Sequence, residues 1–153
     1  MKKIIFVLLI LTPLLLTQCK SSKKTATTFK QGVNFTKSDN LTDIVDLAKK
    51  ENKLVFIDFY TSWCQPCKMM SKDVFTDKEI GKFFNKKFVN YKVNAEKGNG
   101  PNIAALYNVQ AYPTLIWLDT RGRVIERNEG AAYHTKLMQL ANNAILNSSN
   151  SGE

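Results

Sequence analysis

The sequence has few of the side chains from which metal sites are usually built. Its 153 residues include only three cysteines and one histidine. A structural zinc ion needs four nitrogen or sulfur ligands, and an iron–sulfur cluster is held by several cysteines. Cys19 lies far along the chain from the other two cysteines, so we expect neither type of site. Nucleotide and flavin motifs are missing as well, and we expect no cofactor.

The sequence also lacks an arginine-rich stripe or a basic segment interleaved with aromatic residues, although its formal net charge is +9. This charge is unevenly distributed. From residue 41 to the end there are 15 basic and 12 acidic side chains, which leaves a net charge of only +3 for that part. The basic excess lies in the first 40 residues, so we expect no nucleic-acid partner.

No apolar run in the sequence is long enough for a comfortable membrane span. The longest, residues 4–16, follows Lys2 and Lys3 and is interrupted by Pro13. A short basic segment followed by such a run is typical of an export signal. We predict a signal peptide at residues 1–18, with an uncleaved N-terminal anchor as the alternative.

The leader ends in Leu16-Thr17-Gln18-Cys19, which resembles a bacterial lipobox. In that motif Cys19 would carry lipid and become the first mature residue. Lipidation of Cys19 would leave two cysteines to pair with each other in an exported protein. Residues 19–39 are rich in Ser, Thr and Lys and predict a flexible tether. We therefore expect a lipid-anchored protein of the periplasm or cell envelope; the alternative is a secreted, soluble periplasmic protein.

The rest of the chain predicts one domain at residues 40–147, followed by a disordered tail at residues 148–153. Helical periodicity, near-continuous apolar runs and turn residues alternate along it. This order predicts the α/β class, with a central mixed sheet flanked by helices on both faces. We expect a capping box at residues 76–79 to begin one of the helices. The expected helices are 41–50, one starting within residues 64–67, one after 79, 102–107 and 133–146; the expected strands are 54–60, 88–93, 114–118 and 123–127.

Cys64 and Cys67 lie three residues apart in the segment WCQPCK, directly after the apolar run LVFIDFY. A structural disulfide at this spacing would close a very small loop and remove little entropy from the unfolded chain. Redox exchange is favoured, because a helix that starts here would stabilise a thiolate at its N-terminus. We expect Cys64, the more exposed cysteine, to attack a substrate disulfide, and Cys67 to resolve the mixed disulfide.

WCQPCK resembles WCGPCK, the active site of the thioredoxin family. Three further segments resemble the same family: residues 58–60 the segment before the active site, residues 92–94 the strand beside it, and residues 112–114 the cis-proline loop. The resemblance covers roughly residues 40–147 and implies a thioredoxin fold. Residues 62–77 also look like the C-terminal domain of the thiol:disulfide interchange proteins, which work outside the cytoplasm.

The resemblance implies roles for two charged residues near the cysteines. Asp58, inside an apolar strand, would have a raised pKa and would shuttle a proton for Cys67. Lys92 would moderate the charge of Asp58. The alternatives are an Asp58 solvated at a strand end and an exposed Lys92.

The resemblance also implies a substrate-binding surface formed by Trp63, Pro66, Tyr112, Pro113 and Thr114. A cis peptide bond before Pro113 would leave backbone groups of Tyr112 and Thr114 free to pair with a substrate chain. Trp63 would present an apolar face beside Cys64. The alternatives are a trans turn at Pro113 and core packing of Trp63.

Taken together, the residues and the resemblance predict a thiol:disulfide oxidoreductase that acts as a protein-disulfide reductase. In having a proline, Pro66, before the second cysteine, the chain resembles the reducing members of the family. Substrates would be exported proteins with wrong or transient disulfides, or apo-cytochromes. Because the compartment is oxidising, a membrane electron donor would have to recycle the cysteines. We expect a monomer. A dithiol oxidase or isomerase of the same fold and a non-redox binding or chaperone module remain the alternatives.

Overall fold

A computed structural model describes residues 32–150. The predicted signal peptide, Cys19 and most of the predicted tether lie outside these residues. Within the described part no helix is long and apolar enough to cross a membrane. The elements in chain order are β1 (Phe35–Thr36), α1 (Leu41–Glu51), β2 (Leu54–Tyr60), α2 (Gln65–Met69), the π-helix η1 (Met70–Val74), α3 (Lys78–Lys87), β3 (Phe88–Asn94), α4 (Gly100–Leu106), β4 (Thr114–Leu118), β5 (Val124–Glu129) and α5 (His134–Asn150).

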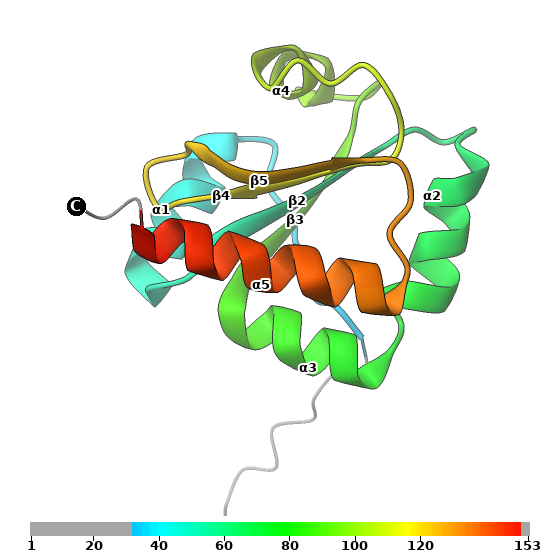
Figure 1. The fold of residues 1–153 in the computed structure, drawn as a ribbon. Helices are drawn as coiled ribbons and strands as arrows, with labels where there is room; N and C mark the ends of the chain where they lie inside the picture. The colour runs from blue at the N-terminus through cyan, green and yellow to red at the C-terminus, as the bar shows by residue number, and fades with distance from the viewer. Residues whose placement is uncertain (1–31, 151–153) are drawn as a thin grey trace, which may run out of the picture.

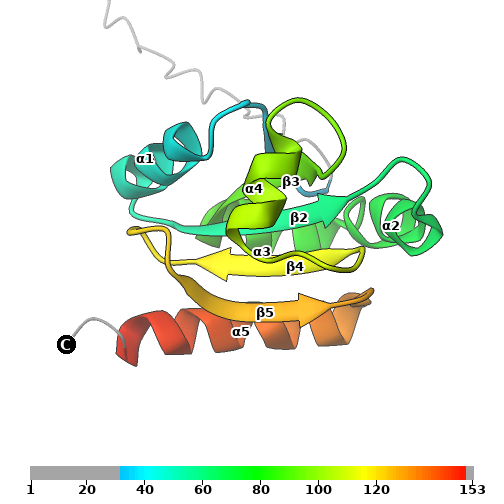
Figure 2. The ribbon, with the colours of Figure 1, turned by 90° about the horizontal axis from the view of Figure 1, so that it is seen from above.

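The five strands form one mixed sheet in the order β1-β3-β2-β4-β5. The first three strands of this order are parallel, whereas β4 and β5 are antiparallel to their neighbours. Figure 2 shows β2 at the centre of the sheet, with α2 following at its carboxyl end. This register places Asp58 of β2 beside Lys92 of β3 on one side and Leu115 of β4 on the other.

Helices cover both faces of the sheet, as the sequence predicted (Figure 1). Successive side chains of a strand point to opposite faces, so each central strand feeds two cores. Val55, Ile57 and Phe59 of β2 pack with α1 and α4, whereas Phe56 packs with η1, α3 and α5. Burial on both faces explains why β2 is nearly continuous in apolar residues. Asp58 is the exception in that run, and it lies on the same face as Phe56.

The first strand was not predicted, because its residues were assigned to the tether. Phe35 pairs with Asn90 of β3, in parallel register. Asparagine side chains hold this segment: the Asn34 backbone N–H donates to Asn85 Oδ1 at 2.8 Å, and Asn90 Nδ2 donates to the Asn34 carbonyl at 3.3 Å. Two residues are too few for a periodic pattern, and the partners lie more than 50 positions away, so local sequence gave no sign of this strand.

Two helix boundaries also differ from the prediction. The cap of α3 is Asp77, whose Oδ1 accepts from the backbone N–H of Ile80 at 2.9 Å, while the Thr76 hydroxyl donates to the carbonyl of Lys72 instead. The last helix continues to Asn150, where a disordered tail was expected. In both places a polar run was ambiguous, because Thr and Asp are both good caps and Ser and Asn are common in loops.

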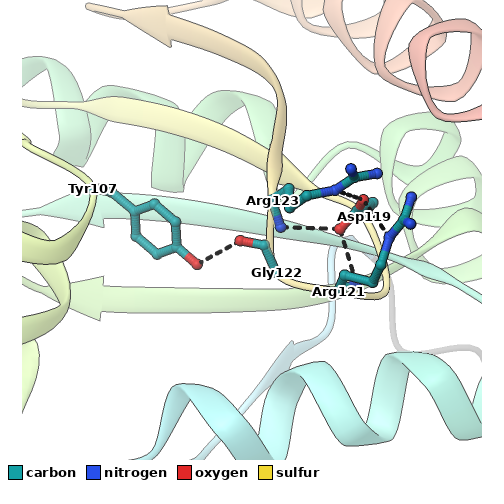
Figure 3. A network of polar contacts seen from close by, with 5 residues as sticks. All are labelled: Tyr107, Asp119, Arg121, Gly122 and Arg123. Atoms are coloured by element: carbon teal, nitrogen blue, oxygen red, sulfur yellow. Dashed lines mark hydrogen bonds and ion pairs between the residues drawn. The ribbon is translucent and has the colours of Figure 1, made fainter. Parts of the chain in front are cut away.

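The β4–β5 turn follows the end of β4 that is remote from Pro113. Asp119 holds this turn (Figure 3). Asp119 Oδ1 accepts from the backbone N–H groups of Arg121 and Arg123 at 2.8 and 2.9 Å. Burial alone would raise the pKa of Asp119, but hydrogen bonds from Arg123 and Arg121 outweigh it and lower the pKa. The Tyr107 hydroxyl donates to the carbonyl of Gly122 at 3.2 Å, which ties the end of α4 to this turn. These hydrogen bonds therefore stabilise the turn and its contact with α4.

Candidate active site

The two cysteines lie where the chain leaves the central strand and starts a helix. Cys64 is the N-cap of α2, and Pro66 lies in its first turn, where the missing N–H costs nothing. Cys64 and Cys67 form a disulfide. The backbone N–H of Cys67 donates to Cys64 Sγ at 3.2 Å. One cysteine therefore caps the helix that carries the other.

The surroundings of Cys64 favour a negative charge on its sulfur once the disulfide is reduced. The helix runs on from α2 into η1 over residues 65–74, and the backbone N–H of Cys67 in its first turn points at Cys64 Sγ. A helix N-terminus carries partial positive charge, and a hydrogen bond to the charged form of a group favours that form. Cys64 is therefore suited to be the attacking thiolate.

Exposure does not separate the two cysteines in the way we expected. In the disulfide form Cys64 is 3% exposed and Cys67 is 2% exposed. These values do not distinguish the two residues, so the prediction that Cys64 is the more exposed cysteine stays a prediction for the reduced protein. Their environments differ instead: Cys64 caps the helix, whereas Cys67 lines a pocket of ≈ 410 Å³. Sequence position alone could not give burial at this level.

Asp58 is buried in β2 and forms an ion pair with Lys92 of β3. Burial raises the pKa of Asp58 above its ordinary value, and the nearby positive charge of Lys92 opposes this only in part. Only one carboxylate oxygen, Oδ2, bonds Lys92; Oδ1 is buried and has no hydrogen-bond partner among the described residues. The alternative of a solvated Asp58 is thus wrong.

Lys92 is held on several sides and is not the freely exposed lysine that was the alternative. Its side chain is 23% exposed. Its ammonium lies 5.3, 4.6 and 5.1 Å from the ring centroids of Phe35, Tyr60 and Phe75, a distance at which a cation is attracted to a ring face. Lys92 Nζ also donates to Ser71 Oγ at 3.1 Å. Sequence reasoning missed Phe35 and Ser71, although Ser71 lies one helical turn after Cys67.

Trp63, next to Cys64, is at the surface and does not pack in the core. It is 66% exposed. Its indole Nε1–H donates to Glu96 Oε1 at 2.8 Å, and its ring meets the ring of Tyr112 edge-on at 6.0 Å between centroids. These contacts join the cysteine segment to the end of β3 and to the Pro113 loop. Glu96 was not predicted as a member of the site.

The Tyr112–Pro113 peptide bond is cis, as predicted. Tyr112 is half-buried, but Pro113 and Thr114 are buried. Thr114 lies within β4, between Phe59 of β2 and Glu129 of β5. Its hydroxyl donates to the carbonyl of Ala111 at 2.8 Å, and the Pro113 carbonyl accepts from the Gly130 N–H at 2.8 Å. The side chain of Thr114 is therefore buried and hydrogen-bonded within the protein. That backbone groups of Tyr112 and Thr114 pair with a substrate chain stays a prediction.

The pocket beside Cys67 contains hydroxyl groups that the sequence did not single out. Thr61 is 1% exposed, and its Oγ1 has no hydrogen-bond partner among the described residues. Ser71 lines the same pocket and joins it to Lys92. The full lining is Tyr60, Thr61, Ser62, Cys67, Lys68, Ser71 and Lys72.

In residues 32–150, no three or more His, Cys, Asp or Glu side chains are grouped so that they could hold a metal ion. His134, at the start of α5, lies 3.8 Å from Asp77 Oδ2 with its side chain 51% exposed. It is a surface residue outside the cysteine site.

The chain is similar to known proteins in both sequence and structure. A family model described as a thioredoxin-like domain matches residues 41–145. Thioredoxin 1 of Chlorobaculum tepidum is 34% identical over 100 residues, 65% of this chain and 93% of that protein. Mitochondrial thioredoxin-3 of Saccharomyces cerevisiae is 39% identical over 98 residues, 64% of this chain and 71% of that protein. A solution structure from Bacteroides thetaiotaomicron, named a "putative disulphide-isomerase", is 36% identical, with a TM-score of 0.67, and covers 75% of this chain and 94% of that one.

Proposed function

Because the chain belongs to the thioredoxin-like family and is a thiol:disulfide oxidoreductase with a Cys64–Cys67 disulfide, we propose that it reduces disulfides in exported proteins. The observation that carries this proposal is Cys64 as the cap of the helix that contains Cys67. That position stabilises a thiolate at Cys64 in the reduced protein. Trp63, Pro66 and Tyr112 form the partly exposed surface around it, to which a substrate chain binds.

The reaction proceeds by two exchanges at sulfur. The Cys64 thiolate attacks one sulfur of the substrate disulfide, the substrate S–S bond breaks, and a mixed disulfide forms as the first substrate thiolate leaves. Cys67 then loses its proton and attacks Cys64 Sγ, which releases the second substrate thiolate. Two electrons pass to the substrate, its two sulfurs take up protons, and the Cys64–Cys67 disulfide forms. The helix holds both sulfurs close together, so the second step is intramolecular.

Asp58 accepts the proton that Cys67 loses. Its Oδ1 has no other hydrogen-bond partner among the described residues, and its raised pKa brings the carboxyl closer to neutrality than an ordinary aspartate. A base works best when its pKa is near the operating pH. Lys92 opposes full neutralisation of Asp58, so the carboxyl can still take up a proton.

The place of action is proposed from the leader. Residues 1–18 serve as a lipoprotein signal, Cys19 carries the lipid, and the following residues tether the domain to a membrane facing the periplasm. A membrane protein returns two electrons to the Cys64–Cys67 disulfide after each cycle, since that compartment is oxidising. This arrangement needs no nucleotide, metal or flavin on the chain itself.

A second candidate is an isomerase or oxidase of the same fold. The name of the Bacteroides thetaiotaomicron relative favours the isomerase. An isomerase uses the same two cysteines but leaves the substrate with a rearranged disulfide. A binding or chaperone module would not need the cysteines at all.

The first prediction concerns the two cysteines. With dithiothreitol as reductant, the full-length protein should accelerate reduction of insulin disulfides, whereas Cys64→Ser should fall to the uncatalysed rate because the attacking sulfur is gone. Cys67→Ser should also lose turnover, and once dithiothreitol has been removed the reduced variant should accumulate a mixed disulfide with the substrate that mass spectrometry detects.

Cys19→Ser is the control, since it changes a cysteine, and with it the proposed lipid attachment, without touching the pair. A Cys64→Ser variant that kept the full activity would contradict the reductase and leave the chaperone module. Conversion of scrambled substrate without net reduction would favour the isomerase.

A further inference from the structure

Ser71 lies on the same helix as Cys67, one turn further on, and reaches across to the sheet. Both residues line the pocket beside the disulfide. Ser71 is partly buried, and its Oγ accepts a hydrogen bond from Lys92 Nζ at 3.1 Å. Lys92 in turn pairs with Asp58. One hydroxyl thus connects the helix that carries the resolving cysteine with the buried ion pair.

The ammonium of Lys92 has few polar partners. It has three N–H donors, and the described residues offer it one carboxylate oxygen and the Ser71 hydroxyl. The rings of Phe35, Tyr60 and Phe75 attract a cation but do not direct it to one point. Ser71 is therefore the second anchor that fixes where the charge lies.

The side chain of Lys92 can adopt another position if the hydrogen bond to Ser71 is lost. It lines a second pocket of ≈ 350 Å³, which is bordered by Asp39, Asn94 and Lys97 and shares Tyr60 with the pocket beside Cys67. Its side chain already has access to solvent. Without Ser71 the ammonium can turn toward this pocket, where water satisfies its donors. Asp58 would then lose part of its counter-charge.

Other charged groups do not replace Lys92 beside Asp58. On β3, Lys92 is the charged residue in register with Asp58; on β4 the neighbours are Leu115 and Thr114. On β2 itself the titratable group is the phenol of Tyr60. On the helix that packs against this face, the titratable groups are Cys67 when reduced, Lys68, Lys72 and Asp73, and the last three are exposed.

We propose that Ser71 is a positioning residue, which holds Lys92 against Asp58 and thereby sets the pH at which Asp58 can take the proton of Cys67. This inference rests on the redox function proposed above. Ser71 touches neither the sulfurs nor the substrate in this role and acts through Lys92.

The direction of the effect follows from burial. A buried carboxyl that loses its cationic neighbour holds its proton more tightly. A protonated Asp58 cannot accept the proton of Cys67. In Ser71→Ala the attack of Cys67 on the mixed disulfide should therefore need a higher pH. Below the midpoint of its pH profile, this step should run about three- to tenfold slower than in the wild-type protein.

The test uses the reduced full-length protein and an aromatic disulfide, 5,5′-dithiobis(2-nitrobenzoate), in single turnovers from pH 4 to 9. Attack by Cys64 releases a first coloured thiolate, and attack by Cys67 on the mixed disulfide releases a second. The rate of the second release should shift to higher pH in Ser71→Ala and return to the wild-type profile in Ser71→Thr, which keeps the hydroxyl. Ser62→Ala is the matched control, because it removes a hydroxyl from the same pocket that bonds neither Lys92 nor Asp58.

A second readout does not depend on turnover. The carboxyl carbon of Asp58, followed by NMR in the reduced protein, should titrate at higher pH in Ser71→Ala than in wild type. Coincident profiles for Ser71→Ala and wild type, a shift to lower pH, or an equal shift in Ser62→Ala would overturn the proposal. Absence of the second release in the wild-type protein would instead refute the redox function, and the NMR titration would still decide the role of Ser71.

Discussion

Asp58 is the residue at which chemistry and stability conflict most directly. Because burial raises the pKa of Asp58 in the folded protein, the folded state binds its proton more tightly than the unfolded chain does. The resulting stabilisation is complete below the pKa of an unfolded aspartate, about 3.9. It is lost as the pH rises through the higher pKa of the folded state. The protein thus keeps a destabilising carboxylate where Cys67 needs a base.

Asp58→Asn should remove this pH dependence. The amide stays neutral, so the free energy of unfolding of the variant relative to wild type should increase as the pH rises from about 4 to 8. Urea unfolding of the oxidised proteins across this range measures it, with the exposed Asp73→Asn as the control for loss of a carboxylate. If the difference in free energy of unfolding between Asp58→Asn and wild type stays constant with pH, Asp58 has no raised pKa in the folded state.

Single residues of the site could be predicted from sequence only when chemistry or family resemblance marked them. Cys64 and Cys67 stand out by spacing, and Asp58 by its place within an apolar run. Ser71 carries no such mark, because a serine in a polar helix is usually solvated. Its importance depends on Lys92, 21 positions away, and on a distance that only the fold defines.

At the scale of elements, the contact between the N-terminal segment and α3 decides whether β1 can join the sheet. A Cβ built on Gly81 would lie 2.3 Å from the backbone C and O of Gly32. The N–H of Val33 donates to the carbonyl of Phe75 at 2.7 Å, which fixes the segment against the end of η1. β1 then brings Phe35 against the ammonium of Lys92. A strand of two residues thus contributes to the redox site.

Gly81→Ala should destabilise the protein by about 1–3 kcal/mol, because backbone atoms of the N-terminal segment would have to move. This loss would occur although alanine favours a helix by about 1 kcal/mol over glycine. Thermal unfolding measures the change, and hydrogen exchange at the Val33 amide should become faster. Lys82→Ala, an exposed neighbour in α3, is the control. A more stable Gly81→Ala protein with unchanged exchange at Val33 would contradict this description of the contact.

Long elements were predictable because their side-chain period is a property of local sequence. The buried strand β2, the strand β3 and helix α1 fall within one residue of their expected bounds. The strand β1 and the π-helical turn η1 could not be predicted from local sequence, since each depends on the residues that pack against it. The cap of α3 shows the same limit, because Thr76 and Asp77 are adjacent and equally plausible by composition.

At the scale of the whole molecule, the fold places the β4–β5 turn and the cysteine site at opposite ends of the sheet. The β4–β5 turn lies at one end of the sheet, and α2 follows the carboxyl end of β2 at the other (Figure 2). Asp119 holds the turn, and the Cys64–Cys67 disulfide lies at the start of α2. Parallel strands β2 and β3 bring Asp58 and Lys92 side by side under the cysteine helix. The scaffold can serve reduction, oxidation or isomerisation, so the direction of electron flow is set by the stability of the disulfide relative to the dithiol.

The reduction potential of the Cys64–Cys67 pair therefore tests the proposed reductase most directly. It is measured by equilibrating the full-length protein with glutathione and dithiothreitol buffers and quantifying the free thiols. We predict a potential near roughly −250 mV or lower, as in members of the family that donate electrons. A potential of roughly −120 to −180 mV would contradict the account, because such a pair would oxidise or isomerise its substrates.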